Sequence, residues 1–152
     1  MSQYIEFYLK SKNGEFLPVG CFSRSSYIYR AFSLYTPYEN GAPFGPNDLK
    51  RVVKDIEAER DSFKAILKKA EWKKDELLKS ADTLDEKYGI LENFSTTKED
   101  CLEEIEAWES ARSYINFLCD IVEDVKYLDD GYDCCNYLWV GIEWVPNHKE
   151  EE

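Results

Sequence analysis

A seven-residue repeat of apolar side chains is the feature that most constrains this chain. The repeat starts at Leu49 and continues at strict intervals with Ile56, Phe63, Ala70, Leu77 and Leu84. Such a period keeps one apolar seam along one side of an α-helix, as in a coiled coil. Asn47 is a suitable N-cap, so we expect a helix over residues 47–88, about 60 Å long. Arg60 and Lys74 interrupt the companion positions of the seam.

A second helix is expected after a short connection. Gly89 suits the position just past a helix end, residues 90–94 connect, and Thr96 and Glu99 have the spacing of a capping box. The second helix is predicted to run to about Leu128, with one apolar stripe that faces the first. Because the connection is short, the two helices should pack antiparallel as a coiled-coil-like hairpin over residues 47–128.

Both ends of the chain have strand patterns. Asn13-Gly14 lies between two apolar runs, which is the strongest short signal for a β-hairpin, and Pro18 places the second strand at an edge or at a break in pairing. Near the C-terminus, apolar residues alternate from Leu138 to Trp144. We therefore predict an α+β fold, in which the N-terminal hairpin and the C-terminal strand form a small antiparallel sheet packed with the helical hairpin.

The segment between the first hairpin and the helices is less regular. Residues 23–35 fit either a strand or a short helix capped by Ser25 or Ser26, and we favour the helix. Three prolines and two glycines in residues 36–46 predict a loop. The organisation expected is a single domain over 1–146, with the sheet in 1–35 and 134–146, followed by an acidic tail at 147–152.

Composition narrows the classes of partner and location. The net charge of −12 argues against direct binding to nucleic acid or anionic membranes, and favours a protein partner with a basic surface. No stretch is apolar enough to span a membrane, and five cysteines at unpatterned spacings fit a reducing compartment. We expect a cytoplasmic protein.

None of the residue patterns known to support catalysis is present. The single histidine, His148, lies near the C-terminal end, and the adjacent Cys134 and Cys135 lack the spacing of a redox or zinc site. Cys101 and Cys119 fit small core residues, although a zinc site built from several cysteines stays open. The prediction is a non-enzymatic protein without cofactor or metal.

Aromatic residues are concentrated in the first 46 positions, where eleven are Tyr or Phe. They fit either the core of the small sheet or an interface, since tyrosine gives a large contact area at low entropic cost. Within this set an aromatic loop is a candidate contact surface for a partner, formed by Tyr35, Tyr38 and Phe44.

Acidic residues on the second helix and just after it form the main candidate site: Glu99, Asp100, Glu103, Glu104, Glu106, Glu109, Asp129 and Asp130. This acidic face predicts a macromolecule-binding protein, in its sharper form a small inhibitor of the phage or mobile-element type that blocks a basic, nucleic-acid-binding surface of a host protein. The alternative is a self-assembling scaffold, a homodimeric helical bundle registered by Arg60 and Lys74. A third hypothesis is a small-molecule or metal site under the sheet.

Overall fold

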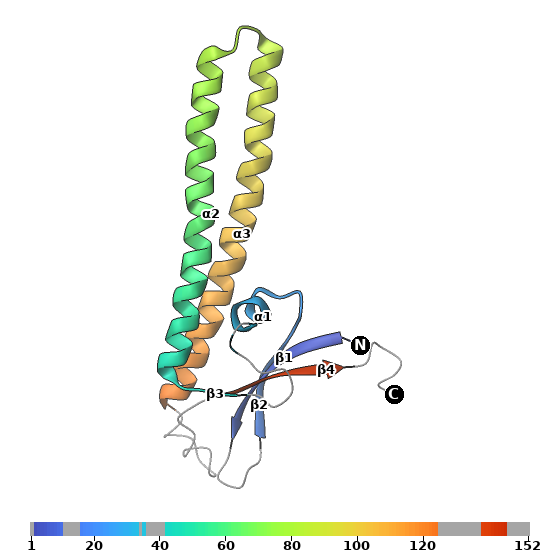
Figure 1. Ribbon diagram of the computed structural model, residues 1–152, viewed down its shortest axis with the longest axis vertical. Helices are drawn as coiled ribbons and strands as arrows, with labels where there is room; N and C mark the ends of the chain where they lie inside the picture. The colour runs from blue at the N-terminus through green and yellow to red at the C-terminus, as the bar shows by residue number, and fades with distance from the viewer. Residues whose placement is uncertain (1, 11–15, 34, 36–41, 125–137, 146–152) are drawn as a thin grey trace. The chain divides into compact units, whose positions relative to one another are not determined.

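An antiparallel sheet of four strands forms from both ends of the chain, in the order β2-β1-β4-β3 (Figure 1). The computed structural model describes residues 2–10, 16–33, 35, 42–124 and 138–145. The strands are β1 (Ser2–Lys10), β2 (Phe16–Ser23), β3 (Ala42–Phe44) and β4 (Leu138–Val145). β1 pairs with β4 from Ser2 opposite Val145 to Tyr8 opposite Trp139. The α+β class, with a helical hairpin and a small antiparallel sheet, is confirmed.

The N-terminal hairpin is present as predicted. β1 and β2 pair from Tyr4 opposite Ser23 to Lys10 opposite Phe16, while the Asn13-Gly14 turn lies outside the described residues. The register shifts where Phe7 opposes Gly20 and Tyr8 opposes Pro18. Because Pro18 has no N–H to donate, it is tolerated here, on an edge strand and beside a bulge.

Residues 23–35 contain a short helix, α1 (Tyr27–Phe32), as we favoured. The Ser26 hydroxyl accepts a hydrogen bond from the Tyr29 N–H at 3.0 Å, which caps the helix. The loop predicted for 36–46 needs correction, because Ala42–Phe44 form β3 against β4 and Pro46 already belongs to the next helix. Pro43 is compatible with β3 because the strand lies at the sheet edge.

The two long helices are α2 (Pro46–Ser80) and α3 (Leu84–Asp124). α2 is capped by Gly45 rather than by the expected Asn47. The Gly45 carbonyl accepts from the Leu49 N–H at 3.1 Å, and the Gly45 N–H donates to the Asp48 carboxylate at 3.0 Å. Pro46 then occupies the first helical position, where its missing N–H costs nothing.

The turn between the helices lies earlier than the sequence suggested. It comprises Ala81–Thr83, and Thr83 caps α3 by accepting from the Glu86 N–H at 3.1 Å. The predicted turn at 89–95 is wrong. Gly89 lies inside α3, and the hydroxyl of Thr96 donates to the Glu92 carbonyl one turn back rather than capping a helix. The predicted extension of this helix from 125 to 128 lies outside the described residues.

Two matched substitutions test this turn. Thr83→Ala should lower the free energy of unfolding by about 1 kcal/mol, because it removes an N-cap. Thr96→Ala should leave it unchanged or raise it by a few tenths of a kcal/mol, since alanine is the better residue inside an exposed helix. Urea denaturation followed by circular dichroism at 222 nm measures both. A larger loss for Thr96→Ala than for Thr83→Ala would place the cap at the second site.

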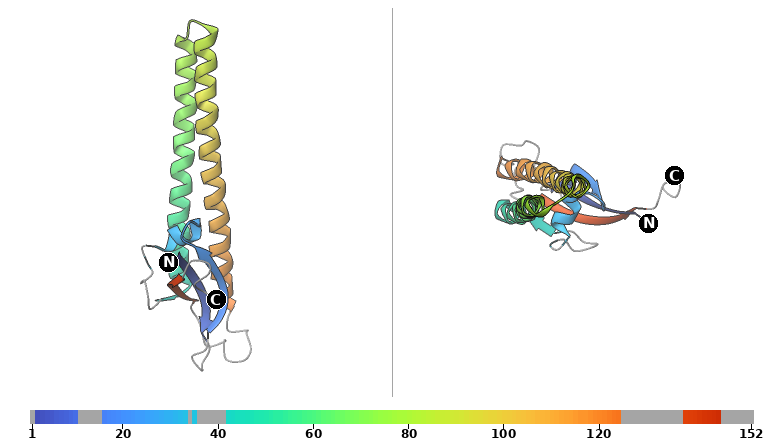
Figure 2. Two further views of the ribbon diagram at one scale, coloured as in Figure 1. Left: turned by 90° about the vertical axis from the view of Figure 1, so that its right-hand side faces the viewer. Right: turned by 90° about the horizontal axis from the view of Figure 1, so that it is seen from above.

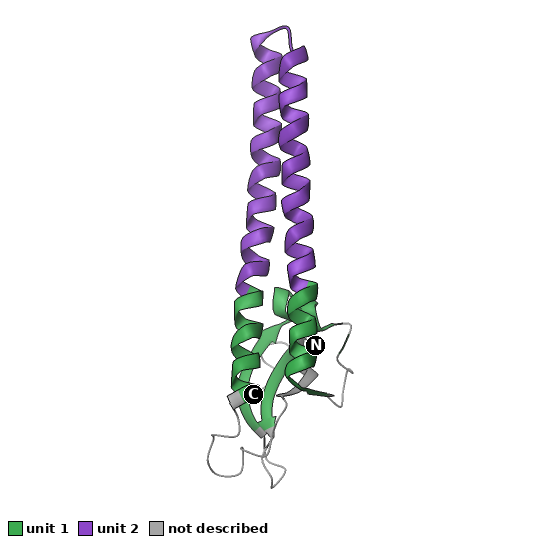
Figure 3. Cartoon of the chain, turned by 90° about the vertical axis from the view of Figure 1, so that its left-hand side faces the viewer, with its two compact units in different colours: residues 1–55, 111–152 green, residues 56–110 purple. Residues whose placement is uncertain are grey.

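The chain divides into two compact units, and both long helices contribute to each (Figure 3). Unit 1 comprises residues 1–55 and 111–152, and unit 2 comprises residues 56–110. Within unit 2, α2 and α3 run side by side in opposite directions (Figures 1 and 2). The predicted helical hairpin is thus confirmed.

The core of unit 1 is rich in aromatic rings. Phe7 of β1 and Phe44 each pack edge-on against Phe32 of α1, with ring centroids 5.2 and 5.3 Å apart. Phe22 packs in the same way on Tyr114 of α3, at 4.8 Å. Among the residues whose burial the structure describes, the buried apolar side chains of this unit are Ile5, Phe7, Leu9, Ile28, Tyr29, Phe32, Phe44, Leu49, Val52, Val53, Ala111, Ile115, Leu118, Cys119 and Val122. For these aromatics, the core interpretation is confirmed.

Candidate functional site on the helical hairpin

Among the described residues, unit 2 has far fewer buried apolar side chains than unit 1. Its buried apolar residues are Ile56, Cys101 and Trp108, and none of the residues from 57 to 100 is buried. Seven of the ten large apolar side chains that the structure describes as exposed lie in this unit: Ile66, Trp72, Leu77, Leu84, Tyr88, Leu91 and Leu102. Three of them lie on α2 and four on α3.

The two cations that interrupt the seam have partners within the hairpin. The Arg60 guanidinium donates to the carboxylates of Glu109 at 2.5 Å and Asp61 at 3.0 Å, and these bonds raise the pKa of Arg60 above its usual value. The Lys74 ammonium lies 3.6 Å from the Asp75 carboxylate and 4.5 Å from the centre of the Phe94 ring. Both charges are therefore balanced without a second copy of the chain.

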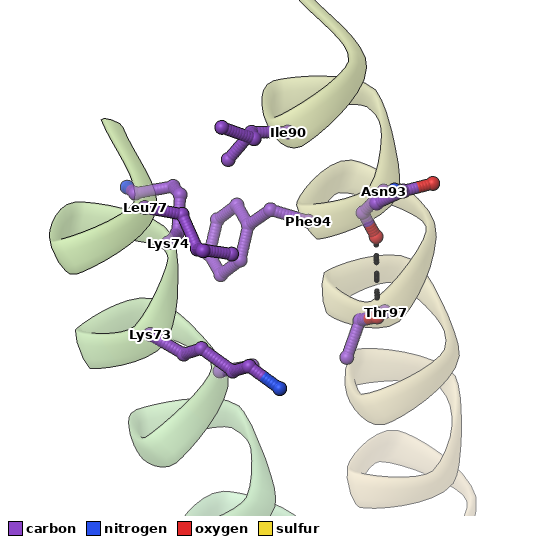
Figure 4. Close-up of a pocket in the computed structure, with 8 residues that line it drawn as sticks. Lys73, Lys74, Leu77, Ile90, Asn93, Phe94 and Thr97 are labelled. Carbon is purple, nitrogen blue, oxygen red and sulfur yellow. Dashed lines mark hydrogen bonds between the residues drawn. The ribbon is translucent and has the colours of Figure 1, made fainter. Parts of the chain in front are cut away.

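A shallow groove of about 290 Å³ runs between α2 and α3 in this unit (Figure 4). Figure 4 shows the Phe94 ring reaching from α3 toward α2, beside Lys74 and Leu77. The groove is lined by Ala70, Lys73, Lys74, Leu77, Ile90, Asn93, Phe94 and Thr97. These described lining residues include no carboxylate, histidine or cysteine, and their ionisable groups are the amines of Lys73 and Lys74.

The predicted acidic face divides into two groups in the structure. Glu99, Asp100, Glu103 and Glu106 are exposed, and none of the ion pairs formed among the described residues involves them. Glu104 and Glu109 are half-buried, and Glu109 is committed to Arg60. Asp129 and Asp130 lie outside the described residues. The first group is the part of the face that a partner can reach.

Two further acids extend this face and were missed in the sequence. Asp85 and Glu92 are exposed and stand seven residues apart in series with Glu99 and Glu106, so the four make one line along α3, which we call the acidic row. A straight helix drifts only about 20° per seven residues, which keeps these side chains on one side. The row was hidden because the predicted turn separated 84–88 from α3. The Thr83-Leu84-Asp85-Glu86 capping box is the sequence signal for this earlier start of α3, and it competes with the one at Thr96.

The structure accounts differently for each of the three residues of the predicted aromatic loop. Phe44 is only 5% exposed and belongs to the core, so it presents no surface to a partner in this structure. Tyr35 is exposed and its hydroxyl donates to the Asp55 carboxylate, which raises the pKa of Tyr35 above its usual value. Tyr38 lies outside the described residues.

Cysteine and histidine positions add no further site in the described part of the chain. Cys101 and Cys119 are buried, as predicted for small core residues, and burial raises the pKa of the Cys119 thiol. Among the residues described, no three histidine, cysteine or acidic side chains gather as a metal site would require. Cys134, Cys135 and His148 fall outside that part.

Comparisons with family models, with curated proteins and with solved structures find no match for this chain. Within the described ranges, no helix combines the length and the apolar character needed to cross a membrane.

Proposed function

We propose that this protein is a non-enzymatic protein-binding protein, and that unit 2 carries the binding surface. One observation supports this most directly: no side chain is buried in residues 57–100, which comprise the last part of α2, the turn and the first part of α3. Helices in proteins owe most of their stability to tertiary packing. A hairpin that leaves Trp72, Leu84 and Tyr88 at 65%, 82% and 71% exposure gains stability when another surface covers it.

The exposed negative charge of α3 favours a partner protein with a basic surface. Within unit 2, the exposed acids of α3 share that helix with Leu84 and Tyr88, and none of the ion pairs among the described residues involves these acids. A basic surface on another protein is complementary to them, and such complementarity speeds association and excludes wrong partners. The sharper form of the proposal is an inhibitor that covers a nucleic-acid-binding surface of a host protein.

The homodimer alternative was suggested by the two cations in the seam of α2. Arg60 and Lys74 would register a four-helix bundle only if their charges needed partners from a second copy. Both are satisfied by Glu109, Asp61 and Asp75 of the same chain.

Affinity capture from the native cell lysate tests the proposal with two variants of equal charge change. The first neutralises the exposed acids of α3 with Glu99→Gln, Asp100→Asn, Glu103→Gln and Glu106→Gln. The control neutralises four acids elsewhere in the hairpin with Glu59→Gln, Glu71→Gln, Glu76→Gln and Asp82→Asn. We expect the α3 variant to capture at least tenfold less of a specific partner, and the control to capture as much as the native chain.

Salt provides a second readout, because exposed charge pairs are screened at high ionic strength. Capture should fall when the salt concentration rises from about 0.15 M to 0.5 M. A partner that both variants retain equally, or that resists salt, would contradict a role for the acids. If the partner binds nucleic acid, a duplex should compete with the native chain for it, as the inhibitor form requires.

A further inference from the structure

α3 carries two apolar stripes rather than one. The inner stripe, spaced alternately three and four residues apart, includes Ile90, Phe94, Cys101 and Trp108 and faces α2, where Phe94 meets Lys74. A second stripe lies on another side of the helix: Leu84, Tyr88 and Leu91 form its first part, Leu102 and Ile105 form its second part, and the polar Ser95 and Lys98 occupy the positions between them. Successive residues of an α-helix are about 100° apart around its axis, so the second stripe faces well away from the first.

The second stripe has no cover in the described part of the chain. Four of its five side chains are exposed, at 82% for Leu84, 71% for Tyr88, 46% for Leu91 and 45% for Leu102. A helix with a single neighbour needs one apolar stripe, whereas a helix packed in a bundle presents a wider apolar face. The pattern of α3 is that of a helix with two packing partners, of which α2 is one.

The acidic row identifies the chemistry of the missing partner. Asp85, Glu92, Glu99 and Glu106 border the second stripe, each one residue after Leu84, Leu91, Lys98 or Ile105. In packed helices, the residues that flank the apolar seam form interhelical ion pairs and set partner choice. A helix lying on the second stripe would therefore place lysine or arginine beside the row at seven-residue intervals.

A second copy of this chain does not supply such a helix. The basic helix of the hairpin is α2, but its exposed series Lys54, Asp61, Lys68 and Asp75 alternates in sign at seven-residue spacing. Every second contact with an uninterrupted acidic row would be repulsive, and like charges across an interface are costly.

We propose that the second stripe of α3 binds an amphipathic helix of another protein, whose apolar stripe is flanked by a row of lysine or arginine. The inference rests on the proposed function and names its partner class. The apolar side chains of that helix cover the stripe from Leu84 to Ile105, and its basic row pairs with the acidic row. The mode is that of a helix laid along an apolar surface.

The test uses two synthetic peptides of about 21 residues, with leucine at the seam positions and either lysine or glutamate at the flanking positions. Fluorescence anisotropy of labelled peptide measures affinity for the full chain and three variants. Leu91→Ser with Leu102→Ser removes two apolar side chains of the stripe, and Glu92→Lys with Glu99→Lys reverses the two central charges of the row. Leu17→Ser with Phe117→Ser is the matched control, since these side chains are 41% and 53% exposed and belong to unit 1.

We expect the native chain to bind the lysine peptide and not the glutamate peptide. The stripe variant and the row variant should each bind the lysine peptide at least tenfold more weakly, and the control should change less than threefold. Because all six substituted positions are exposed, each variant should keep the native circular dichroism spectrum.

Three results would overturn the inference. These are no binding of the lysine peptide at millimolar concentration, equal weakening by the stripe variant and the unit 1 control, or a native dimer in sedimentation that only the stripe variant dissociates. The last result would assign the stripe to a second copy. If the stripe variant still captures the native partner while the α3 charge variant does not, the proposed function stands and this docking site falls.

Discussion

Phe7→Ala is expected to lower the free energy of unfolding by about 3–5 kcal/mol, the largest loss for any truncation we predict here. The Phe7 side chain is fully buried, and its ring contacts three others, with centroids 5.2 Å from Phe32, 6.1 Å from Phe22 and 6.2 Å from Tyr114. The substitution removes the apolar contacts that join β1, β2, α1 and α3. A loss of this size is a large share of the roughly 5–15 kcal/mol that stabilises a typical domain.

Urea denaturation followed by circular dichroism at 222 nm measures the loss, and two variants calibrate it. Leu17→Ala, at a position 41% exposed on β2, should cost less than about 1 kcal/mol. Phe7→Leu should fall between the two, because leucine refills part of the space. The role assigned to Phe7 would be wrong if Phe7→Ala cost no more than Leu17→Ala.

Local patterns in the sequence predicted those elements whose causes are local. The Ser26 cap, the β1–β2 hairpin and the edge position of Pro18 each depend on residues within a few positions of one another. The apolar repeat also predicted the helical hairpin, because its period fixes a helix face without reference to the rest of the fold.

The position of the turn could not be read from the same repeat. Leu84 continues the seven-residue pattern of α2, yet it is 82% exposed in the first turn of α3. Two capping-box patterns occur, at Thr83 and at Thr96, and the sequence alone favours neither. Threonine is tolerated inside a helix when its hydroxyl bonds back to a carbonyl one turn earlier, as Thr96 and Thr97 do.

Phe44 shows how a distant partner changes the interpretation of a residue. Proline on one side and glycine on the other indicate a loop, and a loop aromatic suggests an exposed contact. The strand that pairs with Phe44 begins at Leu138, far along the chain, and the ring that packs against it is Phe32. A pairing with a strand so distant in sequence produces no recognisable pattern in the residues next to Phe44. The strand β3 could therefore not be predicted.

Amide hydrogen exchange should differ strongly between the two ends of α3, because side chains are buried at one end and exposed at the other. We expect amides of residues 90–100 to exchange at least tenfold faster than those of residues 111–122, at the same temperature and pH. In the slower segment Ala111, Ile115, Leu118 and Val122 are buried, whereas no side chain from 90 to 100 is. Mass spectrometry of peptic fragments makes both measurements within one molecule, so sample differences cancel.

Gly89 supplies an independent variant for this measurement. It lies inside α3 with nothing within 4 Å of the position a Cβ would take, so Gly89→Ala adds no clash. Replacing glycine by alanine inside an exposed helix is worth about 1 kcal/mol, or about a fivefold slowing of exchange near residue 89 if the hairpin opens locally. Equal protection along the whole of α3, unchanged by Gly89→Ala, would mean that unit 2 opens only with global unfolding. The absence of buried side chains in residues 57–100 would then not limit the stability of unit 2. The main reason to expect a partner that covers this unit would be lost.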